Sequence, residues 1–140
     1  MKRALKWAAI MIVGLVGIVV LIALTGYIVS ERRIAKTYAI ADEVLTLPAD
    51  AASLTEGQRL VTIRGCGDCH TPDLGGQVLL DDPMLGTIPT ANLTRGQGSA
   101  TAGYSVADWE RAIRHGVGPD GHSLLFMPSY EFSGLSDEQV

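Results

Sequence analysis

The sequence Cys66-Gly67-Asp68-Cys69-His70 decides how the second half of the chain folds. Two cysteines separated by two residues fit three kinds of chemistry. A structural zinc site needs four ligands and usually two such pairs, whereas the whole chain has two cysteines and three histidines. A thioredoxin-like redox site needs a βαβ setting, which the helical and Gly-rich flanks do not predict. The third chemistry is covalent attachment of a c-type haem, which adds the adjacent histidine.

Haem attachment gives a role to both cysteines and to the histidine of the motif. Two thiols three positions apart lie on one helical turn, from which they reach the two vinyl groups of a haem. His70 follows directly and places its imidazole under the iron as the proximal ligand. The motif therefore predicts one covalently attached haem c, bound through Cys66 and Cys69, with His70 as an axial ligand of the iron.

Four side chains are candidates for the second axial ligand: Met84, Met127, His115 and His122. We favour Met127, because it lies in the apolar segment 124–128, which ends in proline, and a thioether reaches iron best from a rigid, dry loop. Met84 is expected to pack in the core. His115 closes a predicted helix, where a cation suits the helix dipole, and His122 follows a turn and is expected to be solvated.

These segments together resemble a class I cytochrome c of the membrane-anchored bacterial monohaem type. The resemblance covers residues 53–140 and rests on Gly57-Gln58-Arg59-Leu60, Gly65–His70, Pro72–Gly76, Ala91-Asn92-Leu93-Thr94, Trp109–Gly116 and Leu125–Ser129. It implies an all-α fold around one haem, with His70 and Met127 as axial ligands, and a redox carrier rather than a catalyst. Similar domains occur as cytochrome subunits of membrane alcohol and aldehyde dehydrogenases, usually repeated within one chain, whereas this sequence has one haem motif.

The first thirty residues form a separate element. Trp7 to Ser30 is a run of 24 residues without a charge, which as a helix is about 36 Å long and spans a hydrocarbon core of about 30 Å with modest tilt. A cleaved signal peptide has a shorter apolar region of ~7–15 residues, so we expect an uncleaved anchor. Three basic residues flank each end, so the charge pattern does not set the orientation.

The charge of the chain is concentrated downstream of this run. Residues 37–140 hold fourteen acidic and five basic residues, a net charge of −9. This balance excludes nucleic-acid binding by phosphate neutralisation and favours redox partners with basic docking patches and salt-sensitive association. Arg59, Arg64 and Arg95 are candidates to bind the haem propionates, as is the polar segment Asn92-Leu93-Thr94.

Capping patterns predict three helix starts. Ser53-Leu54-Thr55-Glu56 and Ser105-Val106-Ala107-Asp108 each open a helix, and Gly116 ends the second one. Val106, Trp109, Ala112 and Ile113 share its apolar face, whereas Glu110 and Arg114 form an i,i+4 pair expected on a solvated face. Ser136-Asp137-Glu138-Gln139 opens a third helix that the chain does not complete.

The predicted organisation is a transmembrane anchor (1–30), a linker (31–52) and a cytochrome c domain (53–140). With both axial positions of the iron filled, substrate has no open site, so we expect an electron carrier and no enzyme. It would take electrons from a quinol-oxidising complex or a dehydrogenase and pass them to an oxidase or another cytochrome. The thiols must stay available for haem attachment, which the resemblance places on the outer face of the membrane, so we expect a bacterial inner-membrane protein with its haem domain in the periplasm. Two alternatives remain: a cytochrome subunit of one particular dehydrogenase, and a haem-based sensor or peroxidase-like enzyme.

Overall fold

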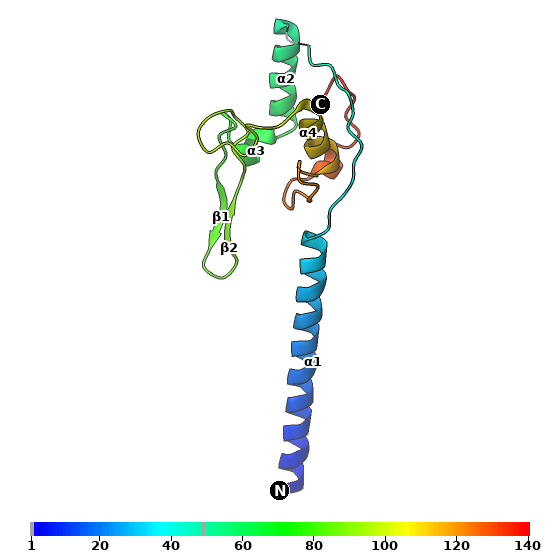
Figure 1. Ribbon diagram of the computed structural model, residues 1–140. Helices are drawn as coiled ribbons and strands as arrows, with labels where there is room; N and C mark the ends of the chain where they lie inside the picture. Colours follow the sequence, from blue (N-terminus) through cyan, green and yellow to red (C-terminus); the bar gives the residue numbers. More distant parts are fainter. Residues whose placement is uncertain (1, 49) are drawn as a thin grey trace.

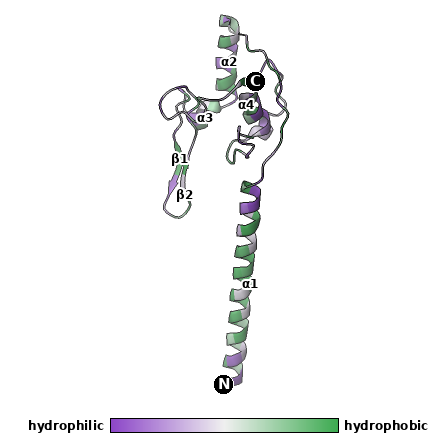
Figure 2. Ribbon diagram, viewed as in Figure 1, coloured by the Kyte–Doolittle hydropathy of each residue, from purple (hydrophilic) through white to green (hydrophobic). Residues whose placement is uncertain are grey.

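The computed structural model describes residues 2–48 and 50–140. Its longest element is α1 (Lys2–Ile34), which projects away from the other elements (Figure 1). No residue of α1 is buried, and its length and hydropathy suffice to cross a membrane. Apolar residues cover its middle and polar residues its two ends (Figure 2). The helix thus continues four residues beyond the predicted anchor, into the start of the predicted linker.

The segment after α1 is extended and lies along the rest of the protein (Figure 1). The Tyr38 amide donates to the Gly121 carbonyl oxygen at 2.8 Å, and Thr37 pairs with His122 as an isolated antiparallel bridge. Further on, Glu43 forms an ion pair with Arg114 at 2.7 Å. These contacts join the segment to residues more than seventy positions away, so it is attached to the domain along much of its length.

Helix α2 (Ala51–Ile63) begins two residues before the predicted capping box. Its N-cap is Asp50, whose Oδ1 accepts hydrogen bonds from the amides of Ala52 and Ser53, both at 3.0 Å. The Ser53 hydroxyl donates to Asp50 as well. The prediction of Ser53 as the cap was therefore wrong, because a carboxylate three residues upstream satisfies the same orphan amides. Gly65, with φ of 71°, then turns the chain into the short helix α3 (Cys66–His70).

A β-hairpin departs from the all-α expectation. Strands β1 (Val78–Asp82) and β2 (Gly86–Pro89) pair antiparallel, with Leu80 opposite Ile88. The tip is closed by Asp82, whose Oδ1 accepts from the amides of Met84 and Leu85, both at 2.8 Å. Met84 is 94% exposed there. The prediction that Met84 packs in the core was wrong, because this turn points its side chain away from the protein.

The last helical elements pack together around a small core. Helix α4 (Val106–Glu110) starts at Ser105 with the predicted capping box. It continues into the wider helical turn η1 (Arg111–His115), which Gly116 ends with φ of 64°, as predicted. The short helix η2 (Ser129–Glu131) lies against η1, where the Ser129 hydroxyl donates to the Ala112 carbonyl oxygen at 3.0 Å. The buried apolar side chains are Leu60, Ala112, Val117 and Phe132.

The pair Glu110–Arg114 is buried, so the prediction of a solvated face was wrong. Glu110 is 1% and Arg114 9% exposed. Arg114 lies within 2.7 Å of a carboxylate oxygen of Glu43 and of Asp137, and 3.5 Å from one of Glu110. Carboxylates from the linker and from the C-terminal segment thus cover the face that the local pattern assigned to water.

The C-terminal segment forms part of the predicted third helix start. The Ser136 amide donates to Gln139 Oε1 at 3.2 Å, and the Val140 amide donates to the Ser136 carbonyl oxygen at 3.2 Å. Val140 lines a hollow of about 120 Å³ with Leu45, Leu47, Val106, Trp109 and Ile113. Three members of the predicted apolar face of α4 and η1 therefore meet the linker and the C-terminus there.

Candidate haem-binding site

Helix α3 brings the three attachment residues together on five consecutive positions. Cys66 and Cys69 are both free thiols and half-buried. Burial is the main cause that raises the pKa of Cys66, and the nearby Asp68 carboxylate adds to it.

The His70 side chain is fixed by a backbone group 21 residues further on. Its Nδ1 lies 2.8 Å from the Ala91 carbonyl oxygen. A carbonyl oxygen only accepts, so Nδ1 carries the proton and donates, which leaves Nε2 with a free lone pair. This arrangement is typical of a histidine that ligates a metal, whose second nitrogen is oriented by an outer hydrogen bond.

Two polar side chains stabilise the end of α3. The Thr90 hydroxyl donates to the Cys69 carbonyl oxygen at 2.8 Å. The Gln77 amide nitrogen donates to the carbonyl oxygens of Asp68 and Cys69, at 3.0 and 3.2 Å. These bonds satisfy carbonyls that a five-residue helix leaves without partners. Sequence analysis assigned no role to Gln77 or Thr90 and named Ala91 only within the segment 91–94 of the resemblance, because no local pattern marks a residue whose partner is far along the chain.

Gly76 allows the segment around Ala91 to come this close. The Gly76 φ is 79°, and a Cβ built on it would lie 2.6 Å from the Thr90 carbonyl oxygen. Its amide donates to the His70 carbonyl oxygen at 2.9 Å. Gly76 therefore lets the backbone of Thr90 and Ala91 come close to the turn that follows α3, which keeps His70 and Ala91 in contact range.

Met127 lies on a different segment from the α3 residues. It is half-buried in the loop between η1 and η2, and its carbonyl oxygen accepts from the Ser129 amide at 2.9 Å. The preceding Leu125 and Phe126 are 61% and 68% exposed. In Figure 1, this loop and α3 both lie beneath α2 and above the end of α1.

The other candidate ligands have different surroundings. Met84 is at the exposed hairpin tip. His115 Nε2 is 3.4 Å from Glu110 Oε1, and His122 Nδ1 is 3.2 Å from Asp120 Oδ2. Each histidine therefore lies beside a carboxylate that is close in sequence, whereas Met127 has an uncharged side chain in an apolar segment.

Two of the propionate candidates make local contacts instead. Arg59 is paired with Glu56 on exposed α2, at 2.5 Å. Asn92 Oδ1 accepts from the Thr94 amide at 2.9 Å and from the Thr94 hydroxyl at 2.7 Å. The polar side chains of 92–94 thus stabilise their own turn, as Asn often does. Arg64 and Arg95 stay candidates.

The donor set fits a c-type haem: two free thiols on one helical turn, with an oriented imidazole beside them. In this fold the haem would be attached at α3, and Nε2 of His70 would be the nitrogen available to iron. Met127, half-buried and uncharged, stays the predicted second ligand.

Comparison with known proteins agrees with this chemistry. No family model and no solved structure matches the chain. The fructose dehydrogenase cytochrome subunit of Gluconobacter japonicus is 33% identical over 66% of this chain and 21% of its own length. The gluconate 2-dehydrogenase cytochrome c subunit of Pantoea cypripedii is 33% identical over 73% and 23%. The cytochrome c subunit of alcohol dehydrogenase (quinone) of Gluconobacter oxydans is 32% identical over 66% and 20%.

The chain spans about a fifth to a quarter of the length of these relatives. Each of these relatives is named as a cytochrome subunit, whereas the dehydrogenases that they belong to act on different substrates. The property that all three have in common is therefore the cytochrome. Together with the thiol pair and the oriented histidine on α3, this similarity shows that the chain belongs to the c-type cytochromes.

Proposed function

We propose that this protein is a membrane-tethered electron-transfer cytochrome with one haem, attached through Cys66 and Cys69 and ligated by His70 and Met127. The observation that carries the proposal is the hydrogen bond from His70 Nδ1 to the Ala91 carbonyl oxygen. This bond orients the His70 ring and leaves Nε2 as the nitrogen that would face a metal ion. When bound, the haem supplies a reversible one-electron couple.

The residues of the chain then have distinct parts in transfer. His70 would ligate the iron through Nε2, and the hydrogen bonds of Thr90 and Gln77 to the carbonyl oxygens of α3 would hold this helix in place. A Met127 thioether on the other side would favour the reduced state and raise the potential. With His70 and Met127 both bound, the protein would leave no open site for a substrate, and the haem would supply only electron transfer to a partner protein.

The proposed setting is the bacterial inner membrane, spanned by α1, with the cytochrome domain in the periplasm. The length of α1 and its lack of burial support the span. Partners would carry basic docking patches, since residues 37–140 have a net charge of −9. Protease added to intact spheroplasts should remove the cytochrome domain, and full protection would reverse this orientation.

A second candidate is a stable cytochrome subunit of a membrane dehydrogenase. The names of the relatives favour it, because each is a subunit of such an enzyme. A free carrier should separate from its partner as salt is raised, since a small charged interface is screened. A subunit should stay with the dehydrogenase through purification in detergent and high salt.

Two measurements test the haem site. Acid–acetone extraction should leave the haem on the polypeptide, whereas haem that partitions into the solvent would disprove covalent attachment. The absorption spectrum of the oxidised protein should show the thioether-to-iron band at long wavelength. Met127→Ala should abolish this band, and the matched control Met84→Ala should keep it. Loss in both variants, or in neither, would contradict Met127 ligation.

Rapid carbon monoxide binding by the unaltered protein at neutral pH would instead support a sensor or peroxidase-like role.

A further inference from the structure

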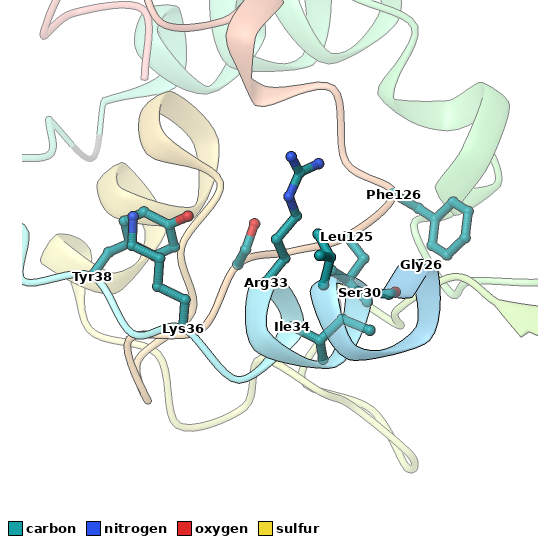
Figure 3. A pocket seen from close by; sticks show the side chains of 10 residues that line it. Gly26, Ser30, Arg33, Ile34, Lys36, Tyr38, Leu125 and Phe126 are labelled. Carbon is teal, nitrogen blue, oxygen red and sulfur yellow. The ribbon is translucent and has the colours of Figure 1, made fainter. Parts of the chain in front are cut away.

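A large hollow lies where α1 meets the cytochrome domain (Figure 3). Its volume is about 740 Å³. One wall is a single face of α1, on which five residues between Gly26 and Ile34 recur at helical spacing. The opposite wall is the segment 123–126, just before Met127. Helix and domain therefore share this hollow, and neither forms it alone.

The α1 wall changes from apolar to cationic along the helix. Gly26 and Val29 form its lower part, and a Cβ built on Gly26 would have no atom within 4 Å. Ser30 follows one residue after Val29, and Arg33 one turn later extends into the middle of the hollow (Figure 3). If α1 spans a bilayer, this order places apolar surface at the depth of acyl chains and a guanidinium at the depth of headgroups.

The cations of the hollow have no carboxylate partners. In residues 2–48 and 50–140, neither Arg33 nor Lys36 has an acidic oxygen within 4.0 Å. The Lys36 ammonium lies 4.5 Å from the centre of the Tyr38 ring. Arg111 and Arg114, by contrast, are paired with carboxylates of the neighbouring linker. Two uncompensated positive charges above an apolar wall are complementary to a phosphodiester with lipid tails.

We propose that this hollow binds one anionic phospholipid of the surrounding membrane, such as phosphatidylglycerol. Its phosphodiester lies at Arg33 and Lys36, and its acyl chains follow Gly26 and Val29. Leu125 and Phe126, which are 61% and 68% exposed, cover the lipid from the domain side. Because these residues directly precede Met127, the bound lipid also holds the loop of the proposed axial ligand. The inference rests on the proposed membrane span of α1.

Native mass spectrometry of the haem-loaded full chain tests the site. The protein is placed in nanodiscs of phosphatidylcholine with one-third phosphatidylglycerol and released into mild detergent, and the retained lipids are counted. The unaltered protein should retain one phosphatidylglycerol. The double variant Arg33→Gln with Lys36→Gln should reduce this retention on the order of tenfold. The control Arg32→Gln removes a charge at the same depth but outside the hollow, and it should retain the lipid.

Each of the following outcomes would overturn the proposal. Equal retention in all variants would mean a general lipid shell, and equal loss in Arg32→Gln would mean attraction by total charge. Retention of phosphatidylcholine in equal proportion would mean a site for acyl chains alone. If the protein enters nanodiscs with a normal haem spectrum but retains no lipid, only this inference fails. If it does not enter nanodiscs at all, the membrane span in the proposed function fails with it.

Discussion

Glu43 in the linker and Arg114 at the end of η1 form an ion pair of 2.7 Å across 71 positions of sequence. Arg114 also contacts Asp137 and Glu110, so one guanidinium joins the linker, the helix and the C-terminal segment. Glu110 is 1% exposed, and its Oε1 lies 3.5 Å from Arg114 Nη1 and 3.4 Å from His115 Nε2. The stability of the domain therefore depends strongly on a single side chain.

Replacing Arg114 by methionine should lower the free energy of unfolding by about 3 kcal/mol, because the Glu110 carboxylate stays buried without its main counter-charge. The measurement is urea unfolding of the haem-loaded protein, followed by far-ultraviolet circular dichroism. The control Arg59→Met removes the exposed pair with Glu56 and should cost less than about 1 kcal/mol. Adding Glu110→Leu to Arg114→Met should recover stability. Equal losses for the two arginine variants would refute a special role of Arg114.

Gly76 and Gly98 have the same backbone conformation but different surroundings, so substituting each of them tests the contact of Gly76 near His70. Their φ angles are 79° and 78°, but a Cβ on Gly76 meets the Thr90 carbonyl oxygen at 2.6 Å and one on Gly98 meets nothing within 4 Å. Gly98→Ala should therefore cost only the left-handed backbone strain, about 1 kcal/mol. Gly76→Ala should cost clearly more and should also lower haem incorporation, because it pushes Ala91 away from His70.

The experiment for this pair compares thermal unfolding and the haem-to-protein ratio of both variants expressed under the same conditions. Similar stability and similar haem content would show that the 76–91 contact has no part in holding His70.

The Ser105 capping box makes stability depend on pH. Hydrogen bonds from the Ser105 hydroxyl and amide, with a smaller contribution from Arg111, lower the pKa of Asp108 below its ordinary value of 3.8. A carboxyl whose pKa is lower in the folded state stabilises the fold above its unfolded pKa. This contribution is lost as the pH falls below about 4 and through the lower folded pKa.

Asp108→Asn should therefore lose less stability than the unaltered protein between pH 5 and pH 2, although it starts from a less stable state at pH 5. Urea midpoints measured across this range check the prediction. Parallel curves for the two proteins would show that Asp108 does not contribute to the acid sensitivity.

The linker should behave as an attached segment rather than a free tether. The Tyr38 amide donates to the Gly121 carbonyl oxygen, whereas Val44 is 96% exposed. We expect the Tyr38 amide to exchange with solvent at least about tenfold more slowly than the Val44 amide. Hydrogen exchange followed by nuclear magnetic resonance of the reduced protein measures both. Equal rates would mean that the linker separates from the domain in solution.

Local chemistry allowed several elements to be predicted from the sequence. Some features can be recognised from a few consecutive residues: the thiol pair, the adjacent His70 and the uncharged run Trp7–Ser30. The Ser105 capping box and the helix end at Gly116 were also predicted correctly, because caps involve residues within one turn. The c-type cytochrome family follows from such local motifs, and the relatives confirm it.

Tertiary structure alone decided the features that depend on distant partners. The burial of Glu110 and Arg114 results from carboxylates in the linker and near the C-terminus, and the orientation of His70 results from a carbonyl 21 residues away. A helical pattern shows which residues share a face, but not what covers that face. For the same reason Met84, apolar and central in the sequence, lies at an exposed hairpin tip, since its position depends on Asp82 closing a turn rather than on its own hydrophobicity.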